Sequence, residues 1–194
     1  MEVGSGTGYY LARIVEAAPK SLALAVDLSK YAARRAARAH ARVGSLVCDV
    51  WDGLPVADGA IGLIVNIFAP RQPKELYRTL HRNGMVLVVA PRQDHLVELR
   101  GVLGLLTIDP DKESRIARGF EPYFQLVAKE PLVWPTRLTK ADVAALVGMG
   151  PSARHLVPTT LSARIARLPD QMTVTAAVTI HIYRSRQYKP GSLE

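Results

Sequence analysis

Short apolar runs alternate along the chain with stretches in which apolar residues recur every three or four positions. The runs predict buried strands at residues 1–3, 21–28, 43–50, 60–68 and 85–91. The helical spacing predicts helices at residues 8–18, 30–41, 73–80 and 94–106. Five alternations of strand and helix favour a mostly parallel sheet with helices on both faces, an α/β fold.

The rhythm changes after about residue 105. Residues 124–134 and 172–184 predict a late strand pair, and residues 139–149 predict a capped helix between them. No repeat and no linker marks a domain boundary. We therefore expect one domain over residues 1–186, and a frayed tail at residues 187–194 that could stem from an expression vector.

The composition is that of a globular protein: 194 residues, 48% hydrophobic and 22% charged. No apolar run reaches the roughly 18 residues of a membrane span, and the first residues do not resemble a signal peptide. A cytoplasmic protein without a membrane partner is expected. Cys48 is the one cysteine, so neither a disulfide nor a cysteine-based zinc site is expected, and no metal ligand set is predicted.

The charge balance favours a polyanionic partner. The net charge is +8 and the pI about 9.9, which suits RNA or DNA, although arginine in place of lysine also follows from a GC-rich genome. Candidate phosphate contacts are Arg34, Arg35, Arg38 and Arg42 on the second predicted helix, and Arg92, Arg100, Arg115 and Arg118 later in the chain. A solvated helix face explains the first group equally well.

A glycine-rich turn joins the first predicted strand to the first helix. Gly4, Gly6 and Gly8 lack the side chains that would keep a ligand from the backbone, and the helix N-terminus behind them offers free N–H groups. Asp27 follows Gly8 by 19 residues and ends the second strand, where a carboxylate can accept both ribose hydroxyls.

Two acidic residues favour S-adenosylmethionine over a dinucleotide as the predicted ligand. Glu2 precedes the first glycine and suits the ammonium of a methionine tail better than a diphosphate, and the third glycine comes one residue too early for the dinucleotide pattern. Asp49 ends the third strand in position to meet an adenine amino group. Tight turns and helix caps without a ligand are the alternative.

Three segments resemble the 23S rRNA (guanine-N1)-methyltransferases: "EVGSGTGYYLARI", "LAVDLSKYAARRAAR" and "IFAPRQPKELYRTLHRNGMVLVVAPRQDHLVELRG". The resemblance implies a Rossmann-like class I S-adenosylmethionine-dependent methyltransferase with a seven-stranded sheet, acting on a guanine of large-subunit ribosomal RNA. One branch of that family gives resistance to macrolides such as tylosin. The family also begins with a cysteine-rich zinc module, which has no counterpart in this sequence.

The resemblance also implies roles for individual residues. The cofactor residues would be Glu2, Gly4, Gly6, Gly8, Tyr9, Asp27, Leu28, Asp49 and Asn66. The substrate residues would be Phe68, Ala69, Pro70, Arg71 and Arg92. Asn66 and His95 are the candidate catalytic residues, although the helix that holds His95 and Glu98 could be purely structural.

Methyl transfer is an in-line displacement governed by positioning, and guanine N1 carries a proton that a base or a group polarising O6 would help to remove. Asn66 or a backbone carbonyl beside it could orient the base. The sequence N-I-F-A there departs from the Asn/Asp-Pro-Pro-aromatic pattern of enzymes that methylate exocyclic amines.

Two further readings stay open: a small-molecule methyltransferase of the same fold, and a shortened, non-catalytic cofactor-binding domain. The second is suggested by a first strand of three residues, for which contacts in a homodimer could compensate.

Overall fold

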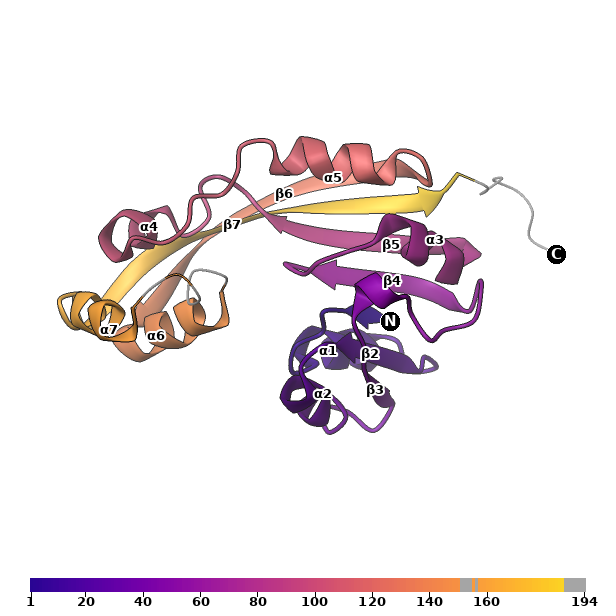
Figure 1. The fold of residues 1–194 in the computed structure, drawn as a ribbon, viewed down its shortest axis with the longest axis horizontal. Coiled ribbons are helices and arrows are strands. Elements are labelled where there is room, and N and C mark those ends of the chain that lie inside the picture. Colours follow the sequence, from indigo (N-terminus) through magenta and orange to yellow (C-terminus); the bar gives the residue numbers. More distant parts are fainter. Residues whose placement is uncertain (151–154, 156, 187–194) are drawn as a thin grey trace. The chain divides into compact units, whose positions relative to one another are not determined.

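The computed structural model describes residues 1–150, 155 and 157–186 (Figure 1). The strands are β1 (Glu2–Val3), β2 (Ala23–Asp27), β3 (Val43–Val47), β4 (Ile61–Ile67), β5 (Leu80–Pro91), β6 (Phe124–Thr139) and β7 (Gln171–Ser185). The helices are α1 (Tyr9–Ala17), α2 (Lys30–Ala36), α3 (Pro73–Thr79), α4 (Val97–Leu103), α5 (Lys112–Phe120), α6 (Lys140–Met149) and α7 (Pro158–Ala166), with a short 3-10 turn at Val50–Asp52. None of the helices within these ranges is long and apolar enough to cross a membrane.

The strands form one mixed sheet in the order β3-β2-β1-β4-β5-β7-β6. β1 runs parallel to β2 and β4, β2 to β3, and β4 to β5, while β7 adds antiparallel pairs. The expected seven-stranded, mostly parallel sheet with a late antiparallel pair is confirmed. The strand order reverses between β1 and β4, and in such sheets ligands bind outside the carboxyl ends of the strands at this point.

The chain forms two compact units. The first contains Met1–Ala90, Glu113–Glu130 and the residues from Ile180 on; the second contains Pro91–Lys112 and Pro131–Thr179. β5, β6 and β7 each continue from one unit into the other. The single domain expected over residues 1–186 stays a prediction, and the tail expected at 187–194 lies outside the described residues.

The first unit buries both faces of its sheet. One face packs Val3, Ile64 and Val88 together with the stacked rings of Phe120 and Tyr183, whose centroids lie 4.4 Å apart. The other face packs the apolar side of α1 and one small residue of α2 against β2 and β3: Leu11, Val15, Ala25, Ala36 and Val43. The central strands are therefore packed on both faces of the sheet. This packing fixes the position of the edge at which their carboxyl ends lie.

The dipeptide Asn83-Gly84 is typical of turns and predicts one just before the strand expected at 85–91. This prediction is wrong, because both residues lie within β5. A Cβ on Gly84 would come within 2.8 Å of the backbone oxygen of Gly62, so glycine lets β5 approach β4 where their register shifts. Glycine here serves a close backbone approach rather than a turn.

The second unit has its own core, built from Leu99, Leu103, Val143, Val147 and Val174 with their neighbours. α6 carries the expected cap: Thr139 Oγ1 accepts the backbone N–H of Asp142, whose carboxylate accepts the N–H of Thr139. α5 and α7 were not predicted, and the helix expected over 94–106 is limited to α4.

Candidate functional site

The three glycines of the first turn have different surroundings. Gly4, Gly6 and Gly8 all have positive φ, at 71°, 54° and 77°. A Cβ on Gly4 would overlap the Cβ of Ala69, and one on Gly8 would lie 3.0 Å from the Cα of Ala36. A Cβ on Gly6 would meet no atom within 4 Å. Gly4 and Gly8 therefore serve close packing within the protein, and Gly6 borders open space.

Asp27 binds the glycine turn and the start of α2 at once. Its Oδ2 accepts the backbone N–H of Gly6 at 2.8 Å, and its Oδ1 accepts that of Ser29 at 2.8 Å. Ser29 caps α2, its Oγ accepting the N–H of Ala32 at 3.3 Å. An ionised carboxylate has about four lone-pair sites, so each oxygen of Asp27 can still accept a ligand hydroxyl.

Glu2 is a buried acid with an unused oxygen. The residue is 1% exposed, and its Oε2 has no hydrogen-bond partner among the described residues. Burial raises the pKa of the Glu2 carboxyl to about 7, opposed by a hydrogen bond from the backbone N–H of Leu11. A buried, unpaired carboxylate is costly unless it meets a cation, so this position fits a ligand ammonium group.

The residues that follow β2 and β3 combine an acid with exposed apolar side chains. Asp49 Oδ1 accepts the N–H of Trp51 at 3.0 Å, which starts the short 3-10 turn. Leu28 and Trp51 are 68% and 57% exposed. Leu28 was predicted and Trp51 was missed; the signal was an aromatic residue two positions after the acid that ends the third strand.

Tyr9 begins α1 directly after the turn and is exposed. Its ring meets that of Tyr10 edge-on at 5.3 Å, and the guanidinium of Arg13 lies 5.9 Å from its centroid. The tyrosine is thus held in place at the rim of the turn without being covered.

Asn66 joins the glycine turn to the segment after β4. Its buried Nδ2 donates to the backbone oxygens of Val3 at 3.3 Å and Pro70 at 2.9 Å. Its Oδ1 is buried and has no partner among the described residues. Together with the contact of Gly4 and Ala69, these bonds fix the segment Phe68–Arg71 against β1.

Phe68 is strained. It has φ of 53°, which a non-glycine residue seldom adopts, and its ring is 48% exposed. Strained backbone persists where the surrounding structure enforces it, and it clusters at functional sites. The strain falls where the resemblance places the target base.

Arg71 forms no ion pair with a carboxylate among the residues that the structure describes. Its Nη2 donates to the backbone oxygen of Ala69 at 3.1 Å, and its Nη1 is buried with no partner among the described residues. Burial lowers the pKa of the Arg71 guanidinium, while the neighbouring Tyr183, whose pKa burial raises to about 12, favours the charged form. A desolvated cation in this state suits an anionic or carbonyl group.

His95 and Arg92 belong to the second unit. His95 Nδ1 accepts the backbone N–H of Ala177 at 3.1 Å, and burial lowers the pKa of its imidazole. Glu98 binds the backbone N–H and the hydroxyl of Thr175, and Arg92 Nε lies 3.1 Å from Asp94 Oδ1. The bonds of His95 and Glu98 attach the start of α4 to β7, so both of these side chains have a structural role.

Arg42 has a structural use as well. Its Nη1 donates to the backbone oxygens of Ala18, Pro19 and Ser21 at 2.8–2.9 Å, and its Nη2 to that of Val15 at 2.6 Å. These carbonyls lie in the last turn of α1 and beyond it, where the regular helical N–H partners end. Val15 and Ala18 each also accept one backbone N–H, from Ala18 and Ser21 respectively. Arg42 therefore stabilises the end of α1 and has little capacity left for a phosphate.

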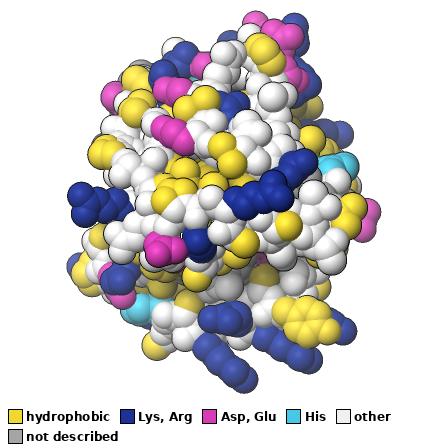
Figure 2. Space-filling model, turned by 90° about the vertical axis from the view of Figure 1, so that its left-hand side faces the viewer, with side chains coloured by type: hydrophobic (Ala, Val, Ile, Leu, Met, Phe, Trp, Pro, Cys, Tyr) yellow, Lys and Arg dark blue, Asp and Glu magenta, His cyan; other side chains and the backbone are white. Residues whose placement is uncertain are grey.

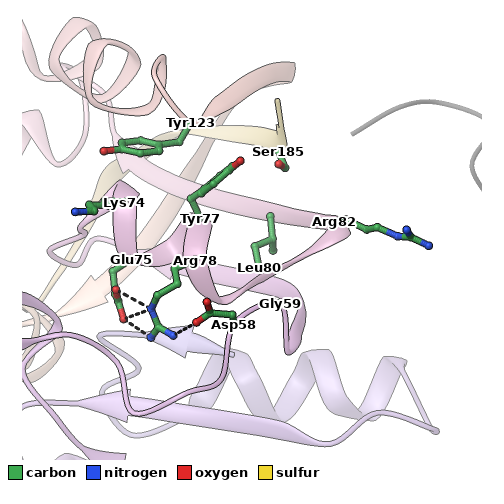
Figure 3. Close-up of a pocket in the computed structure, with 10 residues that line it drawn as sticks. All are labelled: Asp58, Gly59, Lys74, Glu75, Tyr77, Arg78, Leu80, Arg82, Tyr123 and Ser185. Carbon is green, nitrogen blue, oxygen red and sulfur yellow. Dashed lines mark hydrogen bonds and ion pairs between the residues drawn. The ribbon is translucent and has the colours of Figure 1, made fainter. Parts of the chain in front are cut away.

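A cavity of about 540 Å³ lies at the opposite edge of the sheet, where β4 and β5 begin (Figure 3). Arg78 forms its charged wall, with bonds to Glu75, Asp58 and the backbone oxygens of Leu54 and Val56. Asp58 and Glu75 both pair with this one arginine, so the network is internally satisfied.

Solved structures share the fold. A candidate methyltransferase from Bacillus halodurans superposes with a TM-score of 0.62 over 97% of this chain and 91% of its own, at 15% identity. The MccD protein gives a TM-score of 0.60 over 95% and 89%, at 16% identity. The topology and the glycine turn at the switch point define a domain with the class I methyltransferase fold.

Curated relatives identify the family within this fold class. A Streptomyces fradiae protein named 23S rRNA (guanine(748)-N(1))-methyltransferase is 46% identical over 184 residues, 95% of this chain and 66% of its own. A Micromonospora griseorubida protein, named as a candidate 23S rRNA (guanine-N1)-methyltransferase, is 48% identical over 95% of this chain and 62% of its own. The expected resemblance is confirmed: over nearly its whole length the chain is homologous to 23S rRNA (guanine-N1)-methyltransferases, and it spans less than two thirds of these two relatives. No family model matches the chain.

Proposed function

We propose that this chain is the catalytic part of an S-adenosylmethionine-dependent methyltransferase that methylates N1 of a guanine in large-subunit ribosomal RNA. The observation that carries the proposal is the 46–48% identity to relatives named for this activity, over 95% of the chain. Cytoplasmic location, macrolide resistance and homodimerisation are predictions that accompany it.

The unpaired groups at the carboxyl edge fit the cofactor. The buried Oε2 of Glu2 would accept the methionine ammonium, and the open space at Gly6 would let the ligand approach the backbone. Asp27 would accept the ribose hydroxyls through its remaining lone pairs, and Asp49 the adenine amino group between Leu28 and Trp51. S-adenosylmethionine supplies a methyl group already activated by its sulfonium.

The segment after β4 would hold the target guanine. Phe68 offers an exposed ring on which a base can stack, and Arg71 a cation that favours negative charge on guanine O6 as N1 loses its proton. Asn66 is a positioning residue here, because both its N–H groups are spent on Val3 and Pro70. The proposal includes no general base, among the described residues, that would accept the proton from guanine N1.

The test is methyl transfer from S-adenosylmethionine to a guanine-containing hairpin of large-subunit ribosomal RNA. Nucleoside mass spectrometry should find N1-methylguanosine, and reverse transcription should stop at the modified base because N1 takes part in Watson–Crick pairing. A hairpin with adenine at that position is the control. A folded chain that binds S-adenosylmethionine but leaves both hairpins unmodified would contradict the proposed substrate.

A further inference from the structure

One face of α2 carries a stripe of cations that the structure does not neutralise. Tyr31, Arg34 and Arg35 lie in α2 at the spacing i, i+3, i+4, which places them on the same side of the helix, and Arg38 lies in the turn directly after it. All four are exposed, while Ala33 and Ala36 on the other side are buried against the sheet. We call these four residues the α2 stripe.

The stripe lacks the acids that usually accompany such a cluster. No Asp or Glu occurs between Asp27 and Asp49, and none of the three arginines forms an ion pair within the part of the chain that the structure describes. Neighbouring like charges on a helix destabilise it by a few tenths of a kcal/mol per pair. The helix C-terminus favours cations and offsets part of this cost for Arg34 and Arg35. The helix C-terminus does not explain why the aromatic ring of Tyr31 is exposed. The ammonium of Lys30 lies over this ring, 5.3 Å from its centroid.

Arg42 shows that the cluster is not uniform. Its guanidinium donates to backbone oxygens at the end of α1, whereas the stripe arginines are exposed to solvent. In Figure 2 dark blue side chains gather at the lower end of the molecule, the level at which α2 lies in Figure 1. Basic side chains beside an exposed aromatic ring are typical of surfaces that bind the phosphate backbone of RNA.

The stripe also begins beside the cofactor site. α2 starts three residues after Asp27, and its capping residue Ser29 donates its backbone N–H to that carboxylate. We propose that the α2 stripe binds the phosphodiester backbone of the RNA whose guanine is methylated at the carboxyl edge of the sheet. This inference rests on the proposed function and names a surface for its substrate.

The experiment compares two variants with equal charge changes. R34A/R35A/R38A removes the stripe cations, and K20A/K74A/R82A removes three exposed cations elsewhere in the first unit. Affinity for a fluorescent large-subunit rRNA hairpin is measured by anisotropy from 0.05 to 0.3 M salt. S-adenosylmethionine affinity, measured by calorimetry, reports whether each variant keeps its folded cofactor site.

Three phosphate contacts should lower the salt slope of log K by about 2 and the affinity at 0.1 M salt roughly 100-fold, with cofactor affinity unchanged. The control variant should keep nearly the wild-type slope. Equal losses in both variants would overturn the inference in favour of net charge alone, and so would wild-type RNA affinity in the stripe variant. If the wild-type chain neither binds nor methylates the hairpin, the proposed function fails first and the inference falls with it.

Discussion

The substitution Glu2→Gln should make the protein more stable above neutral pH while weakening cofactor binding. The carboxyl of Glu2 is buried, and burial raises its pKa from 4.5 to about 7. A raised pKa means that the folded state favours the protonated form. The favourable contribution of Glu2 is therefore fully present below pH 4.5 and is lost as the pH rises through about 7.

The size of the effect follows from this shift. One pKa unit corresponds to about 1.4 kcal/mol, so the wild-type chain should lose about 2.5 kcal/mol through Glu2 between pH 5 and pH 8. Glutamine does not titrate, and groups elsewhere titrate equally in both proteins, apart from the neighbouring Met1 amine, whose pKa burial lowers to about 6 and the Glu2 charge raises. The free energy of unfolding of E2Q relative to wild type should thus rise by about 2.5 kcal/mol over this range, whatever its value at pH 5.

Urea unfolding at pH 5, 6, 7 and 8 measures the first effect, and calorimetric titration with S-adenosylmethionine the second. Loss of a charge-assisted hydrogen bond to the ammonium should weaken binding at pH 8 by a factor of about 10 to 100. Glu16→Gln, at an exposed acid on α1 that pairs with Arg13, is the matched control.

Two results would refute this reasoning separately. Parallel pH profiles for wild type and E2Q would show that Glu2 does not titrate near neutrality. A stabilised E2Q that binds the cofactor as tightly as wild type would show that the carboxylate does not meet the ammonium.

Four other substitutions test individual contacts. Gly4→Ala should lower the free energy of unfolding by at least 2 kcal/mol, because the new Cβ would overlap Ala69. Gly6→Ala should cost only about 1 kcal/mol of backbone strain and chiefly weaken cofactor binding. Thermal melts and calorimetry on both variants test this, and a larger loss of stability in Gly6→Ala than in Gly4→Ala would contradict it. Asn66→Ala leaves the oxygens of Val3 and Pro70 without their donor, so unfolding should become about 2 kcal/mol easier and kcat should fall more than cofactor affinity; an unchanged kcat in a folded variant would contradict the positioning role. Arg42→Ala should lower the melting temperature by roughly 5 °C or more and leave the salt slope of RNA binding as in wild type, since its guanidinium is spent on the end of α1; a lowered slope would count it among the RNA contacts.

The sheet could be predicted because its strands are continuous apolar runs, and the runs of β2, β3 and β4 were placed to within two or three residues. α5 was missed because Lys112–Phe120 is mostly polar and buries little more than Ile116 and Phe120. The turn at Asn83-Gly84 was wrong because the approach of Gly62 from a neighbouring strand overrides local turn preference. Only the tertiary structure contains that information.

Part of the geometry of the candidate site could be predicted as well. The glycine turn and Asp27 follow from residue type and spacing, since a strand that ends on an acid fixes where its carboxylate lies. The sequence could not separate Gly6 from Gly4, because that difference depends on Ala69, which is 65 residues away along the chain. It also could not show that Arg42 is spent on α1 while its neighbours face solvent.

Asn66 connects these observations at the switch point of the sheet. One N–H of its amide holds β1 directly before Gly4, and the other holds Pro70 in the segment after Phe68. A displacement of either segment would therefore strain the other, and the tight contact of Gly4 with Ala69 makes this coupling stiff. An amide that holds the backbone in this way has only its Oδ1 left to accept a hydrogen bond. Under the proposed function, Asn66 therefore acts mainly by positioning, and the groups that would meet the substrate are the strained Phe68 and the Arg71 guanidinium, whose Nη1 has no partner among the described residues.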